Sequence, residues 1–388
     1  MNKYLYKIKD LEIPPWIKYW FLRKSKINFD LSQILNGTSF DLTDTVNKKL
    51  HLINIFGNSI QNGEPTPENP INIKSSGDNG HIVEKFVNKN LFDIEKIIRG
   101  KVLDITTGEL IARDDMNWCT TDFINVLSKK VFTLSGEIVP QSWALRVVGY
   151  DKNKHYINGF SWGYDNKETI TFDEEVSYIR FTFYKRDYEQ FIQLETGSTA
   201  TDYELHQQQT YTIPCQQPMR AIGEVKDTFV KVDGVWYERH NIREYIANDN
   251  LLGNGETENT INLTTPTLPI EANILPNSLS LKVKSNILQS TINNYSRFNG
   301  TTGSNRIRIA LSKSFALTSE EAKTFLYQKG LKIIYVTTEP LDLPCTQAQI
   351  TALENLQKAR TYKNITHIYS EDEVPANLEI QYYKEKGE

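Results

Sequence analysis

The chain has 388 residues, which is long enough for two or three domains. Hydrophobic residues make up 39% and charged residues 24%, which excludes wholesale disorder, and the net charge of −4 gives no support for nucleic-acid binding by the whole chain. Positive charge gathers in residues 1–29. Seven Lys and Arg against two Asp and Glu give +5 there, so 37 against 46 leave −9 for residues 30–388.

The N-terminal segment, residues 1–45, is basic and aromatic, and it is too short to build a stable core of its own. We expect it to be an arm that docks on a partner protein through a cluster of bulky aromatic residues. An alternative is a strand or short helix packed on the following domain. The candidate docking residues are Trp16, Tyr19, Trp20 and Phe21.

Residues 46–87 are predicted to form a β connector. An alternating run at residues 50–56 is followed by Pro65, Pro67 and Pro70, which enforce an extended path with few backbone donors. Alternation resumes at residues 71–73. The segment therefore predicts a strand, a rigid crossing and a second strand.

Residues 88–205 carry the clearest domain signal, a series of short alternating runs separated by turn residues such as Asn158-Gly159. Such spacing is typical of a β-sandwich, here a jelly-roll-like one. The aromatic share of 11% agrees with β structure, because aromatic side chains suit a pleated, half-buried surface. The predicted strands are 131–139, 143–150, 169–172, 178–184 and 191–194.

Residues 206–388 are predicted to form a second β-rich domain that ends in a small αβ unit. Asp233-Gly234 between alternating runs indicates a tight hairpin. Two helices are expected, because Thr318 with Glu321 and Thr346 with Gln349 have the spacing of capping boxes. The fold class is therefore mainly β: a sandwich and a second β-rich domain with two short helices near the C-terminus.

Signatures of known chemistry are missing from the sequence. There is no nucleophile elbow, zinc-protease motif, phosphate-binding loop or dinucleotide fingerprint, so we expect no enzyme, no metal and no cofactor. Cys119, Cys215 and Cys345 lie far apart, which argues against a disulfide framework or a zinc site. No apolar run reaches the length of a membrane span, and residues 14–22 lack the features of a signal peptide.

The strand pattern instead suggests a binding face. In residues 178–184, alternation places Ile179, Phe181 and Phe183 in the core and the remaining side chains on the opposite face. Aromatic rings beside planar polar groups suit sugars. The alternative is an ordinary exposed β face with cross-strand Tyr–Arg pairs. The candidate carbohydrate-binding residues, including two aromatics of a loop, are Arg146, Tyr150, Trp162, Tyr164, Tyr178, Arg180, Tyr184 and Gln193, with Trp118 as a further exposed aromatic.

Four segments resemble tail proteins of phages that infect Gram-positive bacteria. Residues 57–70, GNSIQNGEPTPENP, are similar to their "G-N-x-x-Q-x-G-x-P-T-P-x-x-P" signature. Residues 88–93, NKNLFD, resemble the "K-N-L-F-D" opening of the module that follows. Residues 191–204 resemble its closing "Q-L-E-x-G-S-T-A-T-x-Y-E", and residues 366–370 with residues 375–380 complete the pattern. The resemblance covers about residues 50–388.

The resemblance implies a minor structural protein of the tail tip or baseplate, with a carbohydrate-binding jelly roll that contributes to attachment to host cell-wall glycan. It carries no catalytic residue. The implied location is the virion tail, after synthesis in the host cytoplasm. Implied partners are other tail proteins and further copies of this chain. Trimers are common in such proteins, although no heptad supports that number here. A purely architectural tail component and a glycan depolymerase are the two alternatives.

Overall fold

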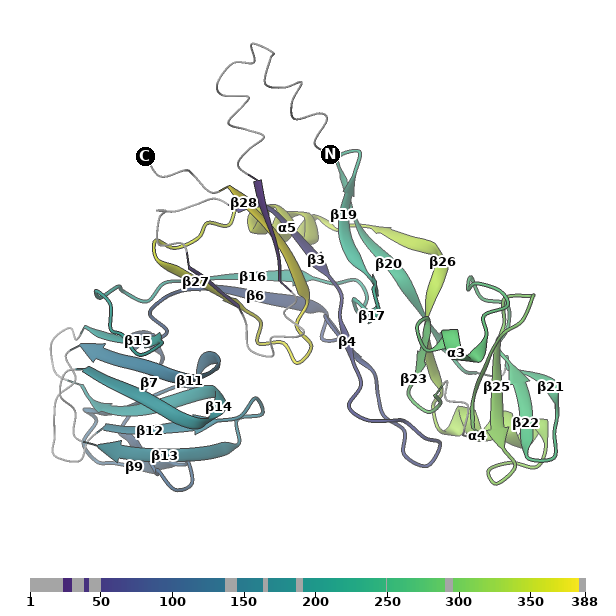
Figure 1. Cartoon of the computed structure of the whole chain (residues 1–388), viewed down its shortest axis with the longest axis horizontal. Helices are drawn as coiled ribbons and strands as arrows, with labels where there is room; N and C mark the ends of the chain where they lie inside the picture. Colours follow the sequence, from purple (N-terminus) through teal and green to yellow (C-terminus); the bar gives the residue numbers. More distant parts are fainter. Residues whose placement is uncertain are drawn as a thin grey trace, which may run out of the picture.

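The computed structural model describes residues 24–29, 38–41, 50–136, 145–162, 167–185, 191–248, 250–289 and 296–383. The chain is mainly β, with curled antiparallel sheets that form half-barrels, and the predicted fold class is confirmed (Figure 1). Three bodies follow one another in the view: a sandwich module, a central unit and a lobe. No described helix is long and apolar enough to cross a membrane.

The sandwich module is built around one very long strand, β14. The C-terminal half of β14 pairs with β12 and β10, and β11 pairs with β14 from Ile179 back to Lys167 with shifts in register. The sheet therefore curls over its own inner face, and Phe132, Phe172, Phe181 and Phe183 are buried there. The elements are η1 (Ile94–Lys96), β7 (Ile97–Arg99), β8 (Lys101–Leu103), β9 (Leu110–Ala112), β10 (Trp118–Thr121), β11 (Ile124–Gly136), β12 (Leu145–Tyr150), β13 (Tyr156–Trp162), β14 (Lys167–Tyr184) and β15 (Ile192–Thr196).

The central unit joins segments from both ends of the chain. One sheet has the order β1-β28-β3-β19-β20-β26-β23, and a second has the order β16-β6-β27-β2. Helix α5 (Gln347–Gln357) packs against β16 and β3. The strands are β1 (Lys24–Phe29), β2 (Thr38–Asp41), β3 (Leu50–Phe56), β6 (His81–Asn88), β16 (Gln208–Pro214), β19 (Thr228–Val232), β20 (Val235–Ile246), β23 (Val283–Ser285), β26 (Lys332–Pro344), β27 (Ile365–Tyr369) and β28 (Asn377–Tyr383).

This pairing differs from the predicted domain boundaries. β3 pairs with β28 and β6 pairs with β27, so residues 46–87 and the end of the chain form one unit rather than a connector and a separate domain. Two strands from the predicted arm also join these sheets, since β1 pairs with β28 and β2 with β27. Local alternation could not reveal this, because it carries no information about which distant strand is the partner.

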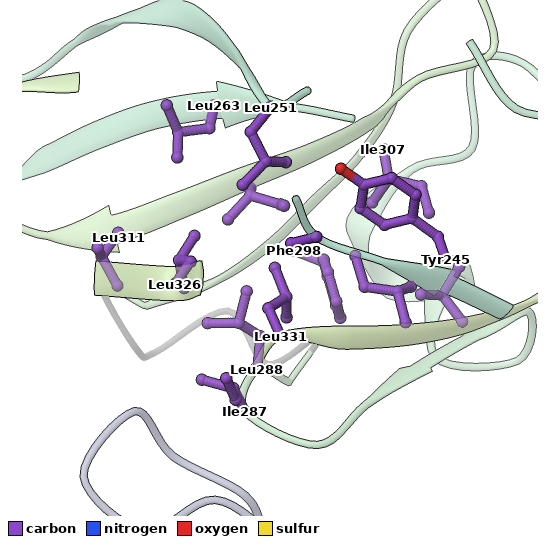
Figure 2. Packing of buried hydrophobic residues seen from close by; sticks show 14 of the residues in the cluster. Tyr245, Leu251, Leu263, Ile287, Leu288, Phe298, Ile307, Leu311, Leu326 and Leu331 are labelled. Atoms are coloured by element: carbon purple, nitrogen blue, oxygen red, sulfur yellow. The ribbon is translucent and has the colours of Figure 1, made fainter. Parts of the chain in front are cut away.

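The lobe lies beyond β20 and β26, which run into it from the central unit (Figure 1). Its core is one buried cluster to which α4 contributes Leu326 and the strands contribute Leu263, Phe298 and Leu311 (Figure 2). Its elements are β21 (Leu252–Glu256), β22 (Thr260–Thr264), α3 (Pro276–Leu279), β24 (Arg297–Thr301), β25 (Ile307–Ser312) and α4 (Ser319–Gln328). Short ladders pair β4 (Ser59–Ile60) with β5 (Lys74–Ser75) and β17 (Ala221–Ile222) with β18 (Val225–Lys226).

The predicted local signals of the C-terminal half are confirmed. Asp233 and Gly234 both adopt positive φ angles, 49° and 85°, as a two-residue hairpin turn requires. Both capping boxes are present, at Thr318 in front of α4 and at Thr346 in front of α5. These features depend on a few neighbouring residues, which is why they could be read from the sequence.

Candidate functional site

The face of β14 that points into the core is the one predicted from the sequence. Ile179, Phe181 and Phe183 are buried, and Val147 of β12 and Leu194 of β15 lie in the same core. Phe92 packs against this face, with its ring centroid 5.3 Å from that of Phe181. The alternation therefore assigned the core side correctly.

The opposite face of β14 and β12 is covered by a segment of the same chain, β8 and β9 with the residues that link them (101–112), and by the Phe123 ring. The Nε of Arg180 donates a hydrogen bond to the carbonyl oxygen of Thr121 at 3.0 Å, and its guanidinium lies 4.7 Å from the centre of the Phe123 ring. Nη1 of Arg146 donates to the carbonyl oxygen of Leu103 at 2.5 Å. Arg146 therefore holds the covering segment at β8, whereas Arg180 is bonded to the end of the neighbouring strand β10 and lies against the Phe123 ring.

A second, smaller core forms beneath the covering segment. Tyr150 packs there with Val148 and Leu103, and its hydroxyl donates to the carbonyl oxygen of Gly108 at 2.7 Å. Arg180 is only 5% exposed and Tyr150 only 3%. The prediction of an open outward face is therefore wrong for Arg180 and Tyr150, because alternation shows which side a residue faces but not whether another segment covers that side.

Gln193 is also buried, at 1% exposure, and belongs to a polar cluster that closes the module. Its amide nitrogen donates to Glu195 Oε1 at 2.8 Å, and its Oε1 accepts from the backbone N–H of Glu204 at 2.9 Å. We call the cluster the module clasp. Its members are Lys89, Asn90, Gln193, Glu195, Thr201 and Glu204.

The module clasp joins the two ends of the sandwich. Nζ of Lys89 donates to Thr201 Oγ1 at 2.7 Å and lies 3.5 Å from the Glu204 carboxylate. The amide nitrogen of Asn90 donates to the carbonyl oxygens of Ile192, at 3.1 Å, and Glu204, at 2.9 Å. The residues that carry the resemblance at the opening and closing of the module thus hydrogen-bond its two ends to each other.

The Pro-rich crossing, residues 57–70, is also fastened at both ends. It packs closely against the central unit at Gly57, and it bonds further on to β23 and to the segment that follows β23. A Cβ at Gly57 would lie 2.4 Å from the carbonyl carbon of Met219, so only glycine fits there. The amide nitrogen of Gln61 donates to the carbonyl oxygen of Ser285 at 2.8 Å. The carbonyl oxygen of Pro65 accepts from the Gln289 amide at 3.1 Å.

One predicted residue lies at an accessible aromatic edge. The Tyr184 hydroxyl donates to Asp115 Oδ2 at 2.9 Å and accepts from the Asn117 amide at 3.4 Å. The Trp118 ring stands perpendicular to the Tyr184 ring, with centroids 5.4 Å apart. Both rings are half-buried. We call these four residues the Tyr184 edge.

The other predicted residues fall into two groups. Tyr178 is half-buried beside Phe123, with Nζ of Lys154 5.3 Å from its ring centre. The side chain of Trp162, the whole of Tyr164 and the predicted docking residues lie outside the described part of the chain. Those docking residues are Trp16, Tyr19, Trp20 and Phe21.

A small pocket lies where the sandwich module meets the central unit. Nδ1 of His206 donates to the carbonyl oxygen of Asn90 at 2.7 Å, and its Nε2 is 3.8 Å from Asp93 Oδ2 with no hydrogen-bond partner among the described residues. Burial lowers the pKa of His206, which keeps the ring neutral near pH 7. Further lining residues are Lys96, Asp122, Phe123 and Glu371.

Sequence reasoning missed this pocket because its walls come from distant segments of the chain. The one usable signal was the resemblance at residues 88–93, which ends at Asp93. The described residues contain no group of His, Cys, Asp or Glu that could hold a metal ion. Cys119, Cys215 and Cys345 are free thiols.

No family model, curated protein or solved structure matches this chain.

Proposed function

We propose that this protein is a structural component of the tail tip or baseplate of a phage that infects Gram-positive bacteria. The observation that carries the proposal is the module clasp. The residues of the resemblance at Lys89, Asn90 and Glu204 are bonded to one another and fasten the ends of an inserted β module. The Pro-rich crossing supports it in the same way, because Gln61 and Pro65 bond to residues near the lobe.

Within that function, an architectural role for the sandwich module is favoured over glycan contact through the predicted face. At the centre of that face, Arg180 is bonded to the end of β10 and Tyr150 to the covering segment, and neither has free surface for a sugar. We therefore assign the module to contacts with neighbouring tail proteins. Residues 1–23 would contribute through their basic charge and aromatic side chains, such as Trp16 and Trp20.

The architectural assignment is tested by localisation. Gold-labelled antibody against this protein, applied to phage particles from a strain that carries the gene, should decorate the tail tip in electron micrographs. Particles assembled with a chain that lacks residues 1–23 should lose the label, while the purified truncated protein still folds. Unlabelled tails, or label on the capsid alone, would overturn the proposal.

Glycan contact at the Tyr184 edge is a second candidate, favoured by two half-buried rings beside a carboxylate and an amide. A single such site binds weakly, with a Kd of roughly 1 mM, so several copies would be needed for firm attachment. Multimerised protein should sediment with purified host cell walls, and Tyr184→Ala should reduce the bound fraction. Tyr156→Ala, which changes an exposed aromatic of β13, is the control. Equal binding of the two variants would remove this candidate.

A further inference from the structure

A groove lies along β16, which is the edge strand of its sheet among the described residues. One wall is the strand and the other is α5, which packs against it. None of the lining side chains is charged, and those of α5 are short or polar. They are Thr210, Tyr211, Thr212, Gln347, Ala348, Thr351, Ala352 and Asn355.

Among the described residues β16 has no second partner strand, although the carbonyl oxygen of its last residue, Pro214, accepts a hydrogen bond from the Gln349 amide of α5 at 3.0 Å. β16 is the last strand of its sheet and pairs with β6 without a register shift. The backbone N–H of Asn88 bonds to the carbonyl oxygen of Gln207, and that of Cys215 bonds to Gly80. Hydrogen-bonded pairs alternate in an antiparallel ladder, so Tyr211 faces β6 with its N–H and C=O, whereas Thr210 and Thr212 direct theirs away from β6.

An edge of this kind can accept an extended peptide as an added strand. Free edges of proteins are usually protected by a Lys, a Pro, a bulge or a covering segment; β16 has a Pro only at its last residue and carries neither a charge nor a bulge. Main-chain hydrogen bonds to the edge supply affinity, and side chains of the added strand enter the groove.

We propose that residues 3–9 of this same chain occupy the groove as an added strand. In that segment Tyr4, Tyr6 and Ile8 alternate with Leu5, Lys7 and Lys9, so one side is largely aromatic and apolar and the other mainly basic. The first side fits against the short, uncharged side chains of α5. The basic side faces solvent on a body whose residues 30–388 carry a net charge of −9 (37 Lys and Arg, 46 Asp and Glu).

The chain between this segment and β1 is long enough to reach. Lys24, the first residue of β1, pairs with Tyr383 of β28, and β28 lies beside β3. The backbone N–H of Ile53 in β3 bonds to Gln357 at the end of α5. β1 and β3 are about 10 Å apart, and α5 adds roughly 16 Å. Residues 10–23 span up to roughly 46 Å when extended.

A consequence for docking rests on the proposed function. With residues 3–9 held at β16 and residues 24–29 paired to β28, the aromatic residues Trp16 and Trp20 lie in a loop tied at both ends. Tying a loop lowers the entropy that it loses on binding. The arm would thus present its aromatic side chains to a neighbouring tail protein from a fixed position.

Amide hydrogen exchange tests the added strand. In the full chain, the amides of Thr210 and Thr212 should exchange at least about tenfold more slowly than in a chain that lacks residues 1–9. The amide of Tyr211, which bonds to β6, should be unchanged and serves as the internal control. Equal rates for Thr210 and Thr212 in the two proteins would overturn the proposal.

Two further measurements test whether the groove is filled by this segment of the same chain or by a second copy of the protein. Ala348→Trp fills the groove and should release Thr210 and Thr212, whereas Glu354→Trp, on a part of α5 that does not line the groove, should not. Protection should also be independent of protein concentration. Protection that is lost on dilution would assign the groove to a second copy and overturn docking within one chain. Neither outcome depends on where the protein lies in a virion.

Discussion

Arg180 reaches back across 59 residues of sequence to bond its Nε to the carbonyl oxygen of Thr121. The residue lies on the strand face opposite the aromatic core, where it holds the end of β10, with its guanidinium over the Phe123 ring. A side chain that alternation places on an outer face is thus a structural cation in the folded chain.

Arg180→Ala should therefore destabilise the sandwich module. Loss of the guanidinium leaves the Thr121 carbonyl buried without that donor and removes the contact with Phe123, at a cost of about 2 kcal/mol. Urea unfolding followed by tryptophan fluorescence measures the change. Lys154→Ala is the control, because Lys154 also lies over Phe123 but is exposed, and it should change stability by less than about 0.5 kcal/mol. Equal effects would contradict the anchoring role.

Phe181→Ala should be more costly. Phe181 is fully buried between Phe92 and Phe183, so the truncation leaves a cavity that costs about 3–5 kcal/mol. Phe191→Ala removes a ring that is 44% exposed and should change the urea midpoint little. A small loss for Phe181→Ala would show that this side chain is not part of a close-packed core.

The module clasp depends on Lys89, whose side chain is almost fully buried beside Glu204. Lys89→Met removes one partner of this pair and should cost about 3 kcal/mol. Lys85→Met breaks a more exposed pair with Glu371 and should cost less than about 1 kcal/mol. Thermal unfolding of both variants decides the point, and the clasp account fails if the two variants melt alike.

His240 should make stability depend on pH on the alkaline side. Burial alone would lower its pKa, but hydrogen bonds to Asp227 and Glu238 outweigh burial and raise the pKa to about 9. An unfolded His has a pKa of about 6.5, so this stabilisation is complete below that pH and is lost as the pH rises through about 9. The loss is up to about 1.4 kcal/mol per pH unit within that window.

Urea unfolding between pH 6 and pH 10 measures this slope, which His240→Gln should reduce. A variant with the wild-type slope would assign the titration to other groups.

Glu84 should act as a destabilising group at neutral pH. Its carboxyl group is fully buried and has no hydrogen-bond partner among the described residues, and burial, followed by the nearby Asp372, raises its pKa well above the usual range. Since the folded pKa is raised, its favourable contribution exists only below the unfolded pKa and is lost as the pH rises. Glu84→Met should therefore raise the urea midpoint at pH 8.

The gain from Glu84→Met should shrink as the pH falls toward 4. Glu373→Met, at an exposed position, is the control and should show neither effect. A Glu84→Met protein that is less stable than the wild type at pH 8 would mean that the carboxyl group has a partner that stabilises it.

Features set by neighbouring residues could be predicted from the sequence alone. Thr318 and Thr346 begin helices because each has a capping partner three residues later, and Asp233-Gly234 forms a hairpin because both residues tolerate positive φ. The core side of β14 followed from the period of two, which put Phe181 and Phe183 together.

Tertiary structure decided what these elements meet. The end of the chain pairs with β3 and β6, and residues 101–112 with Phe123 cover the face that carries Arg180, because distant segments bury more apolar surface together than apart. The roles of Lys89 and Gln193 also depend on the tertiary structure. A polar residue in a strand is compatible with binding a sugar or with closing a module, and only the position of Thr201 and Glu204 in space distinguishes the two.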